Sequence, residues 1–107
     1  MANFNIRTQL KGCSFQKRPS YLTWLRQNPD PPVWLEREPD CAYDPNAIRV
    51  MIRKPEPVCI GYLPRDLASV LAPLIDSGKP VTISRVIPTG GTPGKHQGCV
   101  ADLSWDR

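Results

Sequence analysis

Proline is the feature that most limits what this chain can fold into, because 13 of its 107 residues are proline. That is about 12% of the chain, against an average of about 5%. The prolines are scattered rather than repeated, which excludes collagen and low-complexity linkers. Since proline ends helices and cannot donate to a strand ladder, the pattern favours short strands joined by ordered turns over a helical bundle.

Apolar and polar residues alternate in several short segments, as expected for strands with one buried face. The predicted strands cover residues 3–14, 33–38, 47–53, 58–63, 80–88 and 99–105. Residues 19–27 are expected to form two helical turns that the proline-rich run 28–32 then ends. The sequence therefore predicts a mainly β fold with one or two helices (α+β). We expect one domain over residues 1–107, a small OB-like six-stranded β-barrel closed by a helix.

Residues 64–75 form the clearest helical pattern, with apolar residues at the spacing of one helix face. Pro64 suits the first helical position, and Gly78 suits the position just after the last turn. Pro73 lies inside this pattern, so we expect it to kink the helix or restart it as a second short turn.

The net charge of +4 is distributed unevenly along the chain. Residues 30–44 hold five acidic residues and one basic residue, so that segment carries −4 and the remainder carries +8. A basic surface around one acidic segment can attract a polyanion and still place carboxylates at a chosen point. The alternative interpretation is an ordinary solvated surface of mixed charge.

Apolar runs are only a few residues long, far below the ~20 of a membrane span, and the first residues lack a signal-peptide core. We therefore expect a cytoplasmic protein with no membrane contact. The four cysteines lack zinc-knuckle spacing, and the single histidine, His96, would need a distant cysteine besides Cys99. No metal and no cofactor are expected, and no phosphate-binding motif of the Walker type is present.

Two central segments carry a resemblance: residues 37–50, which read REPDCAYDPNAIRV, and residues 60–68, which read IGYLPRDLA. Together with residues 11–15 and 87–91, they resemble the HIRAN domain family over nearly the whole chain. The resemblance implies an OB-like barrel that captures the 3′ end of single-stranded DNA without catalysing a reaction. In the best-understood member the domain is fused to a SNF2-type motor. We expect this chain to be a free-standing monomer that can work beside a separate helicase or nuclease in DNA repair, replication or a mobile element.

The resemblance also implies roles for individual residues. Tyr43 matches a tyrosine that stacks on the terminal base, and Asp44 matches the aspartate that holds the 3′-hydroxyl. Phe15 replaces a tyrosine that packs on the other side of the DNA end. Arg65 matches a basic residue that meets phosphate, and Tyr62 stands where some members have a phosphate-contacting histidine.

The remaining candidates lie in a glycine-rich loop or depart from the family pattern. Lys95 and His96, in the loop over residues 89–97, can reach toward a phosphate. Ser14 stands in place of an arginine, and Asp40 and Cys41 belong to a run that replaces Asn-Asn-Pro near the nucleotide.

Several of these residues also have a purely structural interpretation. Tyr43 and Tyr62 can be amphipathic rim residues, and Asp44 before Pro45 can simply cap a turn. Phe15 can belong to the core, and Arg65 can be a solvated helix residue.

Two other functions stay open. The first is a protein-interaction barrel, an accessory factor or inhibitor that has lost DNA binding because Ser14, Asp40 and Cys41 replace polar family residues. The second is a metal-dependent phosphoesterase that uses Glu38, Asp40 and Asp44 as ligands, although no second carboxylate cluster is present to build a two-metal site.

Overall fold

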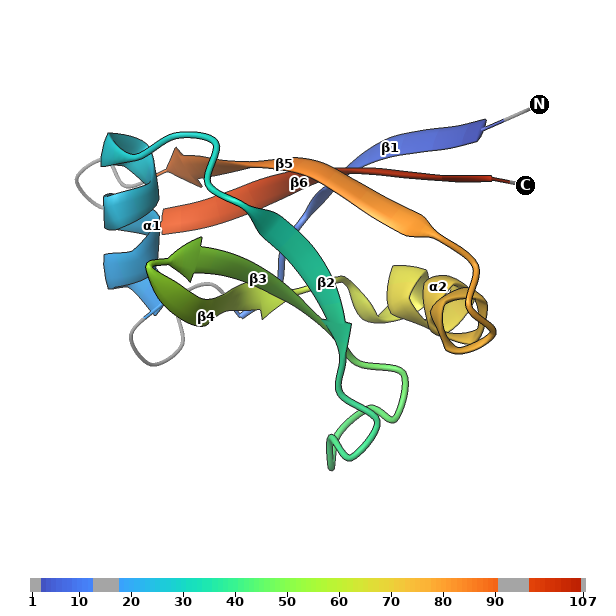
Figure 1. Cartoon of the computed structure of the whole chain (residues 1–107). Helices are drawn as coiled ribbons and strands as arrows, with labels where there is room; N and C mark the ends of the chain where they lie inside the picture. Colours follow the sequence, from blue (N-terminus) through green and yellow to red (C-terminus); the bar gives the residue numbers. More distant parts are fainter. Residues whose placement is uncertain (1–2, 13–17, 91–96, 107) are drawn as a thin grey trace.

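The computed structural model describes residues 3–12, 18–90 and 97–106. Within these ranges the chain forms six strands and two helices (Figure 1). The strands are β1 (Asn3–Gln9), β2 (Val33–Arg37), β3 (Ile48–Lys54), β4 (Glu56–Tyr62), β5 (Val81–Gly90) and β6 (Gln97–Asp106). The helices are α1 (Arg18–Gln27) and α2 (Arg65–Asp76). Neither described helix is long and apolar enough to cross a membrane.

The strands pair into two antiparallel sheets of three strands each. Sheet A has the order β1-β6-β5, and sheet B has the order β2-β3-β4. Figure 1 shows sheet A above sheet B, with α1 at one end of the pair and α2 at the other. The mainly β fold and its six strands are therefore as predicted.

The expected closure into a barrel is wrong. Among the described residues, no ladder of hydrogen bonds joins β2 to β5, although these strands lie close together. Apolar side chains, including Val33 and Val81, pack against the core there and take the place of hydrogen bonds. On the opposite side, one bridge joins the sheets within the described part of the chain. In it the Lys11 N–H donates to the Tyr62 carbonyl at 2.8 Å, and the Tyr62 N–H donates to the Lys11 carbonyl at 2.9 Å.

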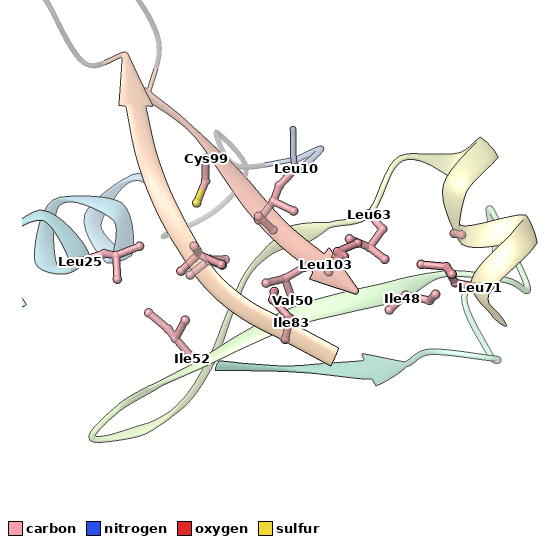
Figure 2. Close-up of a cluster of buried hydrophobic side chains, with 14 of the residues drawn as sticks. Leu10, Leu25, Ile48, Val50, Ile52, Leu63, Leu71, Ile83, Cys99 and Leu103 are labelled. Carbon is pink, nitrogen blue, oxygen red and sulfur yellow. The ribbon is translucent and has the colours of Figure 1, made fainter. Parts of the chain in front are cut away.

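The core fills the space between the two sheets (Figure 2). Ile48, Val50 and Ile52 of β3 each have an exposed fraction of 0%, so one face of this strand is fully buried. Leu103 of β6 and Leu71 of α2 belong to the same cluster. All the buried residues described are apolar. Hydrophobic burial is therefore the main term that stabilises the core between the two sheets.

Helix α2 begins one residue later than predicted and is a single helix. Of the two alternatives expected at Pro73, a kink or a restart, the restart is therefore wrong. The reason is that Pro73 lies on the exposed side, while the neighbouring Leu71 and Ala72 are buried and hold the turn in place. The predicted end is confirmed: Gly78 has a φ of +86°, and its N–H donates to the Ile75 carbonyl at 3.0 Å. Helices often end in this way, with a glycine in the left-handed backbone conformation just after the last turn.

Strand limits differ from the predictions at the two glycine-containing connections. Strand β1 ends at Gln9 rather than at residue 14, and Gly12 follows with a φ of +74°. Strands β5 and β6 extend to Gly90 and back to Gln97, so their hairpin is longer than expected.

Candidate functional site

A pocket of about 700 Å³ opens where the β2–β3 loop, β4 and the start of α2 meet. Its size is typical of pockets that hold a small molecule or part of a larger ligand. The lining residues come from segments far apart in the sequence: Lys11, Gly12, Glu38, Cys41, Tyr43, Asp44, Ala47, Arg49, Cys59, Tyr62, Leu63 and Arg65. The pocket therefore exists only once both sheets and α2 have assembled.

The loop between β2 and β3 forms one wall of the pocket. It is closed at its base, because the Glu38 N–H donates to the Ala47 carbonyl at 2.9 Å. Further along, the Cys41 N–H donates to the Glu38 carbonyl at 3.1 Å, and the Ala47 N–H donates to the Asp44 carbonyl at 3.0 Å. These bonds satisfy the backbone locally, so the loop has a defined shape.

Arg37, the last residue of β2, ties this loop to α2. Its Nη1 donates to the Ala47 carbonyl at 2.8 Å, and its Nη2 donates to the Pro45 carbonyl at 2.9 Å. Its Nε and Nη2 also donate to the Asp76 carboxylate at 2.9 and 3.2 Å. The Arg37 side chain is only 14% exposed, and its bond to the Ala47 carbonyl is partly buried, whereas its bonds to Pro45 and Asp76 are exposed. Together these bonds hold the wall of the pocket in position.

Asp44 and Tyr43 lie on that wall. The Asn46 N–H donates to Oδ1 of Asp44 at 2.9 Å, so Asp44 does form the turn that its position before Pro45 predicts. Among the described residues, none binds the second carboxylate oxygen of Asp44, and the residue lines the pocket. Tyr43 is 89% exposed, which leaves most of its ring available to a ligand.

The floor of the pocket is a chain of polar contacts on sheet B. Tyr62 donates its hydroxyl hydrogen to Oε2 of Glu38 at 2.9 Å, and Oε1 of Glu38 lies 3.7 Å from Nη1 of Arg49. Arg49 is also paired with Glu36 across β2 and β3. The positive charge of Arg49 is therefore matched by two carboxylates, and Glu38 fixes the orientation of the Tyr62 hydroxyl.

Two basic residues at the pocket remain available for an anion. Lys11 and Arg65 are both exposed, and neither forms an ion pair with another described residue. Arg65 is the first residue of α2, whose N-cap residue Pro64 provides no side-chain hydrogen bond. Because a helix N-terminus carries partial positive charge, this side of the pocket favours a negatively charged group.

The pocket brings together five of the residues that the sequence singled out: Cys41, Tyr43, Asp44, Tyr62 and Arg65. Asp40 is exposed and is not one of the lining residues. Four further candidates lie outside the described residues: Ser14, Phe15, Lys95 and His96.

Three charged lining residues were missed as binding candidates: Lys11, Glu38 and Arg49. The register of the sheets explains why they belong here, since Arg49 pairs with Tyr62 and Lys11 bridges to the same residue. The alternation of Arg49 with the buried Ile48 and Val50 was the one available signal that its side chain faces outward.

The three carboxylates considered as metal ligands do not converge. Glu38 contacts Tyr62 and Arg49, Asp44 forms a turn, and Asp40 lies away from the pocket lining. Across residues 3–12, 18–90 and 97–106, no group of three or more His, Cys, Asp or Glu side chains is placed to hold a metal ion.

Comparison with known proteins gives matches for the sequence and the fold. Residues 3–92 match the HIRAN domain family. The chain is 51% identical over 45 residues to a Fanconi-associated nuclease 1 homolog of Oryza sativa subsp. japonica, which covers 41% of this chain and 5% of that protein. It is 45% identical over 56 residues to a putative SWI/SNF-related matrix-associated actin-dependent regulator of chromatin subfamily A member 3-like 1 of Arabidopsis thaliana, covering 52% of this chain and 6% of that protein. The matched part is thus a small fraction of each relative.

A solved structure is similar over almost the whole chain. The crystal structure of the HIRAN domain of human HLTF matches with a TM-score of 0.59, covering 96% of this chain and 77% of that chain. The sequence identity is 19%, so this match shows the fold alone.

Proposed function

Because the chain belongs to the HIRAN domain family, we propose that it is a non-catalytic domain that binds nucleic acid at the pocket described above. The ligand we propose is the last nucleotide of a single strand of DNA with a free 3′-hydroxyl. One observation carries this proposal: an exposed aromatic ring, a carboxylate with one unused oxygen and two basic residues outside any ion pair among the described residues line the same pocket.

Tyr43 supplies the part of the recognition that does not depend on base identity. A base that stacks on its exposed ring gains about 1–3 kcal/mol, whichever base it is. Tyr62 lies on the pocket floor with its hydroxyl held by Glu38, so it offers a fixed polar and aromatic surface beneath the nucleotide.

Asp44 supplies the recognition of the strand end. An ionised carboxylate only accepts hydrogen bonds, so it can bind a terminal hydroxyl and repels a terminal phosphate. The turn bond to Asn46 occupies Oδ1 of Asp44 and orients the carboxylate, which leaves Oδ2 to accept the 3′-hydroxyl hydrogen.

Lys11 and Arg65 supply attraction to the phosphates. The lining holds three basic and two acidic residues, and Arg49 is matched by carboxylates, so the excess positive charge is small. We expect micromolar affinity that weakens with salt. Two phosphate contacts would give a slope of log K against log salt of about −1.4.

The relatives suggest a setting for this activity. The names of the two similar proteins refer to a nuclease and to a regulator of chromatin, and each is far longer than the matched segment. We propose that this domain acts on strand ends that a helicase or nuclease produces or consumes, as a monomer in the cytoplasm.

The test compares labelled oligonucleotides that differ only at the end, one with a 3′-hydroxyl and one with a 3′-phosphate. We expect the wild type to prefer the hydroxyl about ten-fold, which corresponds to about 1.4 kcal/mol. Asp44→Asn keeps a turn acceptor but removes the charge, so the preference should fall close to one. Asp40→Asn is the matched control, because Asp40 is exposed and does not line the pocket.

Equal affinity for the two oligonucleotides, unchanged by Asp44→Asn, would contradict the reading of the 3′ end. Absence of salt-dependent retention on single-stranded DNA would contradict nucleic-acid binding as a whole and would favour the protein-interaction function.

A further inference from the structure

The pocket floor continues along the outer face of sheet B. Because side chains alternate along a strand, Arg49, Met51 and Arg53 lie on the face of β3 opposite to Ile48, Val50 and Ile52. On that outer face Arg49 is half-buried, Met51 is covered with 8% exposed, and Arg53 is exposed. The register then defines successive rows across the sheet. The pocket row contains Glu36, Arg49 and Tyr62, the second row contains Trp34, Met51 and Cys59, and the third row contains Arg53 and Pro57.

The second row already belongs partly to the pocket. Cys59, at its β4 end, lines the pocket together with Arg49 and Tyr62 of the first row. On β4 a shift of register places Tyr62 and Cys59 three residues apart. On β2 and β3 neighbouring rows are two residues apart, or about 6.6–6.8 Å. Trp34 therefore lies one such step beyond the pocket row, and Arg53 lies two steps beyond it.

The side chains of the second and third rows suit a flexible strand that carries negative phosphates and flat bases. The guanidinium carbon of Arg53 lies 5.5 Å from the centre of the Trp34 ring, so the two side chains form a layered cationic and aromatic surface. Trp34 is half-buried and Arg53 is exposed, so the layer is accessible from solvent. A base can stack on such a surface, and the guanidinium can also pair with a phosphate.

No acidic residue stands in the second or third row as the described strands define them. Glu36, in the pocket row, shares the positive charge of Arg49 with Glu38, so the one net negative charge of these three side chains lies at the pocket and not beyond it. Glu56, the first residue of β4, pairs in register with Lys54, whose ammonium lies 5.6 Å from the ring centre of Tyr21. The outer surface beyond the pocket therefore attracts a polyanion.

We propose that the second and third rows form an additional binding site for single-stranded DNA, with Trp34 and Arg53 as its main contacts. This inference rests on the proposed function: with the terminal nucleotide in the pocket and its neighbour at the pocket edge, the nucleotides before these two lie over Trp34 and Arg53. The pocket then recognises the strand end, and the additional site adds affinity that depends on the length of the strand.

The test measures the affinity of two oligonucleotides of thymidine with 3′-hydroxyl ends, a dinucleotide and a hexanucleotide. For the wild type, the hexanucleotide should bind at least ten-fold more tightly than the dinucleotide. Trp34→Ala should weaken the hexanucleotide about ten-fold and leave the dinucleotide unchanged, since one base loses its stacking partner. Trp34→Phe retains a ring and should recover most of that loss.

Arg53→Gln provides a second variant that leaves the half-buried tryptophan in place. It should weaken only the hexanucleotide and reduce the size of the salt slope by about 0.7. Arg85→Gln is the matched control, because Arg85 is an exposed arginine of β5 in sheet A, and it should change neither affinity.

The outcomes separate the two proposals. If the dinucleotide binds but the hexanucleotide gains nothing, or if Trp34→Ala and Arg53→Gln leave the hexanucleotide affinity unchanged, the additional site is contradicted while the pocket stands. If neither oligonucleotide binds the wild type, the proposed function itself fails.

Discussion

The two faces of strand β3 have opposite chemistry. On the inner face, Ile48, Val50 and Ile52 are completely buried against sheet A and the helices. On the outer face, Arg49 lies in the pocket between two carboxylates, and Arg53 is exposed beside Trp34. Met51, between these two arginines, is the one buried apolar residue on the outer face of β3. Any apolar residue of suitable size can serve the inner face, whereas the outer face depends on particular charges and rings. The comparison teaches that the fold and the proposed function are carried by different side chains of one strand.

A change on the inner face should have the largest effect, and it should act on stability. Ile52→Ala leaves a cavity in the core and should cost about 2–5 kcal/mol of unfolding free energy. Thermal denaturation would measure this, with about 4–8 °C lost for each kcal/mol. At low temperature, where the variant is still folded, its affinity for DNA should match the wild type. A large loss of DNA affinity in the folded variant would contradict the claim that the inner face of β3 affects stability and not binding.

Arg37 is the residue where stability and binding should change together. Arg37→Met removes the bonds to Pro45, Ala47 and Asp76, and we expect a loss of about 1–3 kcal/mol in stability. DNA affinity should also fall, because the wall that carries Asp44 is no longer fixed. Asp76→Asn is a milder control, since Arg37 keeps its bonds to the two carbonyls. Unchanged DNA affinity in Arg37→Met would show that the pocket does not depend on this anchor.

A change at the pocket rim should act on binding alone. Tyr43→Ala should weaken DNA binding by about 5- to 150-fold through lost stacking. The melting temperature should stay the same, because Tyr43 is 89% exposed. Tyr43→Phe keeps the ring and should bind nearly as well as the wild type. Isothermal titration would give these affinities, and an equal loss for both variants would assign the effect to the hydroxyl instead of stacking.

The smallest effect is expected on sheet A, far from the pocket face. The hydrogen bond from Arg7 to Asp102 is the main reason that the pKa of Asp102 lies below its ordinary value of 3.8. A carboxylate with a lowered pKa in the folded state stabilises the protein above the unfolded pKa, and this stabilisation is lost as the pH falls through the folded pKa. Asp102→Asn should therefore lower the melting temperature slightly at neutral pH.

The same variant should melt like the wild type once the acid form of Asp102 predominates. Melting curves at about pH 7 and about pH 2.5 would show whether the difference narrows. A difference that stays constant with pH would mean that packing, and not the ion pair, explains the effect.

Local patterns predicted most of the fold. Alternation located β3 and β6. The apolar spacing of residues 67, 70, 71, 74 and 75 with Gly78 located α2, although Val70 of that predicted face is 57% exposed. Barrel closure could not be predicted in this way, because it depends on whether distant strands β2 and β5 pair by hydrogen bonds or pack by side chains. Pro73 misled the prediction because its position on the exposed side of the helix depends on tertiary packing.

In the candidate site, too, some residues could be predicted from local sequence motifs and others depend on tertiary contacts. Tyr43, Asp44, Tyr62 and Arg65 lie in two short motifs that the family resemblance identified, and they do line one pocket. Lys11 reaches that pocket through the bridge between the two sheets, which no local pattern encodes. Arg49 reaches it through its pairing with Tyr62 in the β3–β4 hairpin, and alternation alone indicates its face but not its partner.

A nuclear magnetic resonance titration would locate the DNA-binding surface on the folded protein. Backbone amide signals of the labelled protein would be followed while a single-stranded hexanucleotide with a 3′-hydroxyl is added. The account predicts shifts on the outer face of sheet B and around the pocket, including Tyr43, Arg49 and Tyr62, with the amides of sheet A and α1 unchanged. Shifts centred on sheet A or α1, or no shifts at saturating DNA, would contradict it.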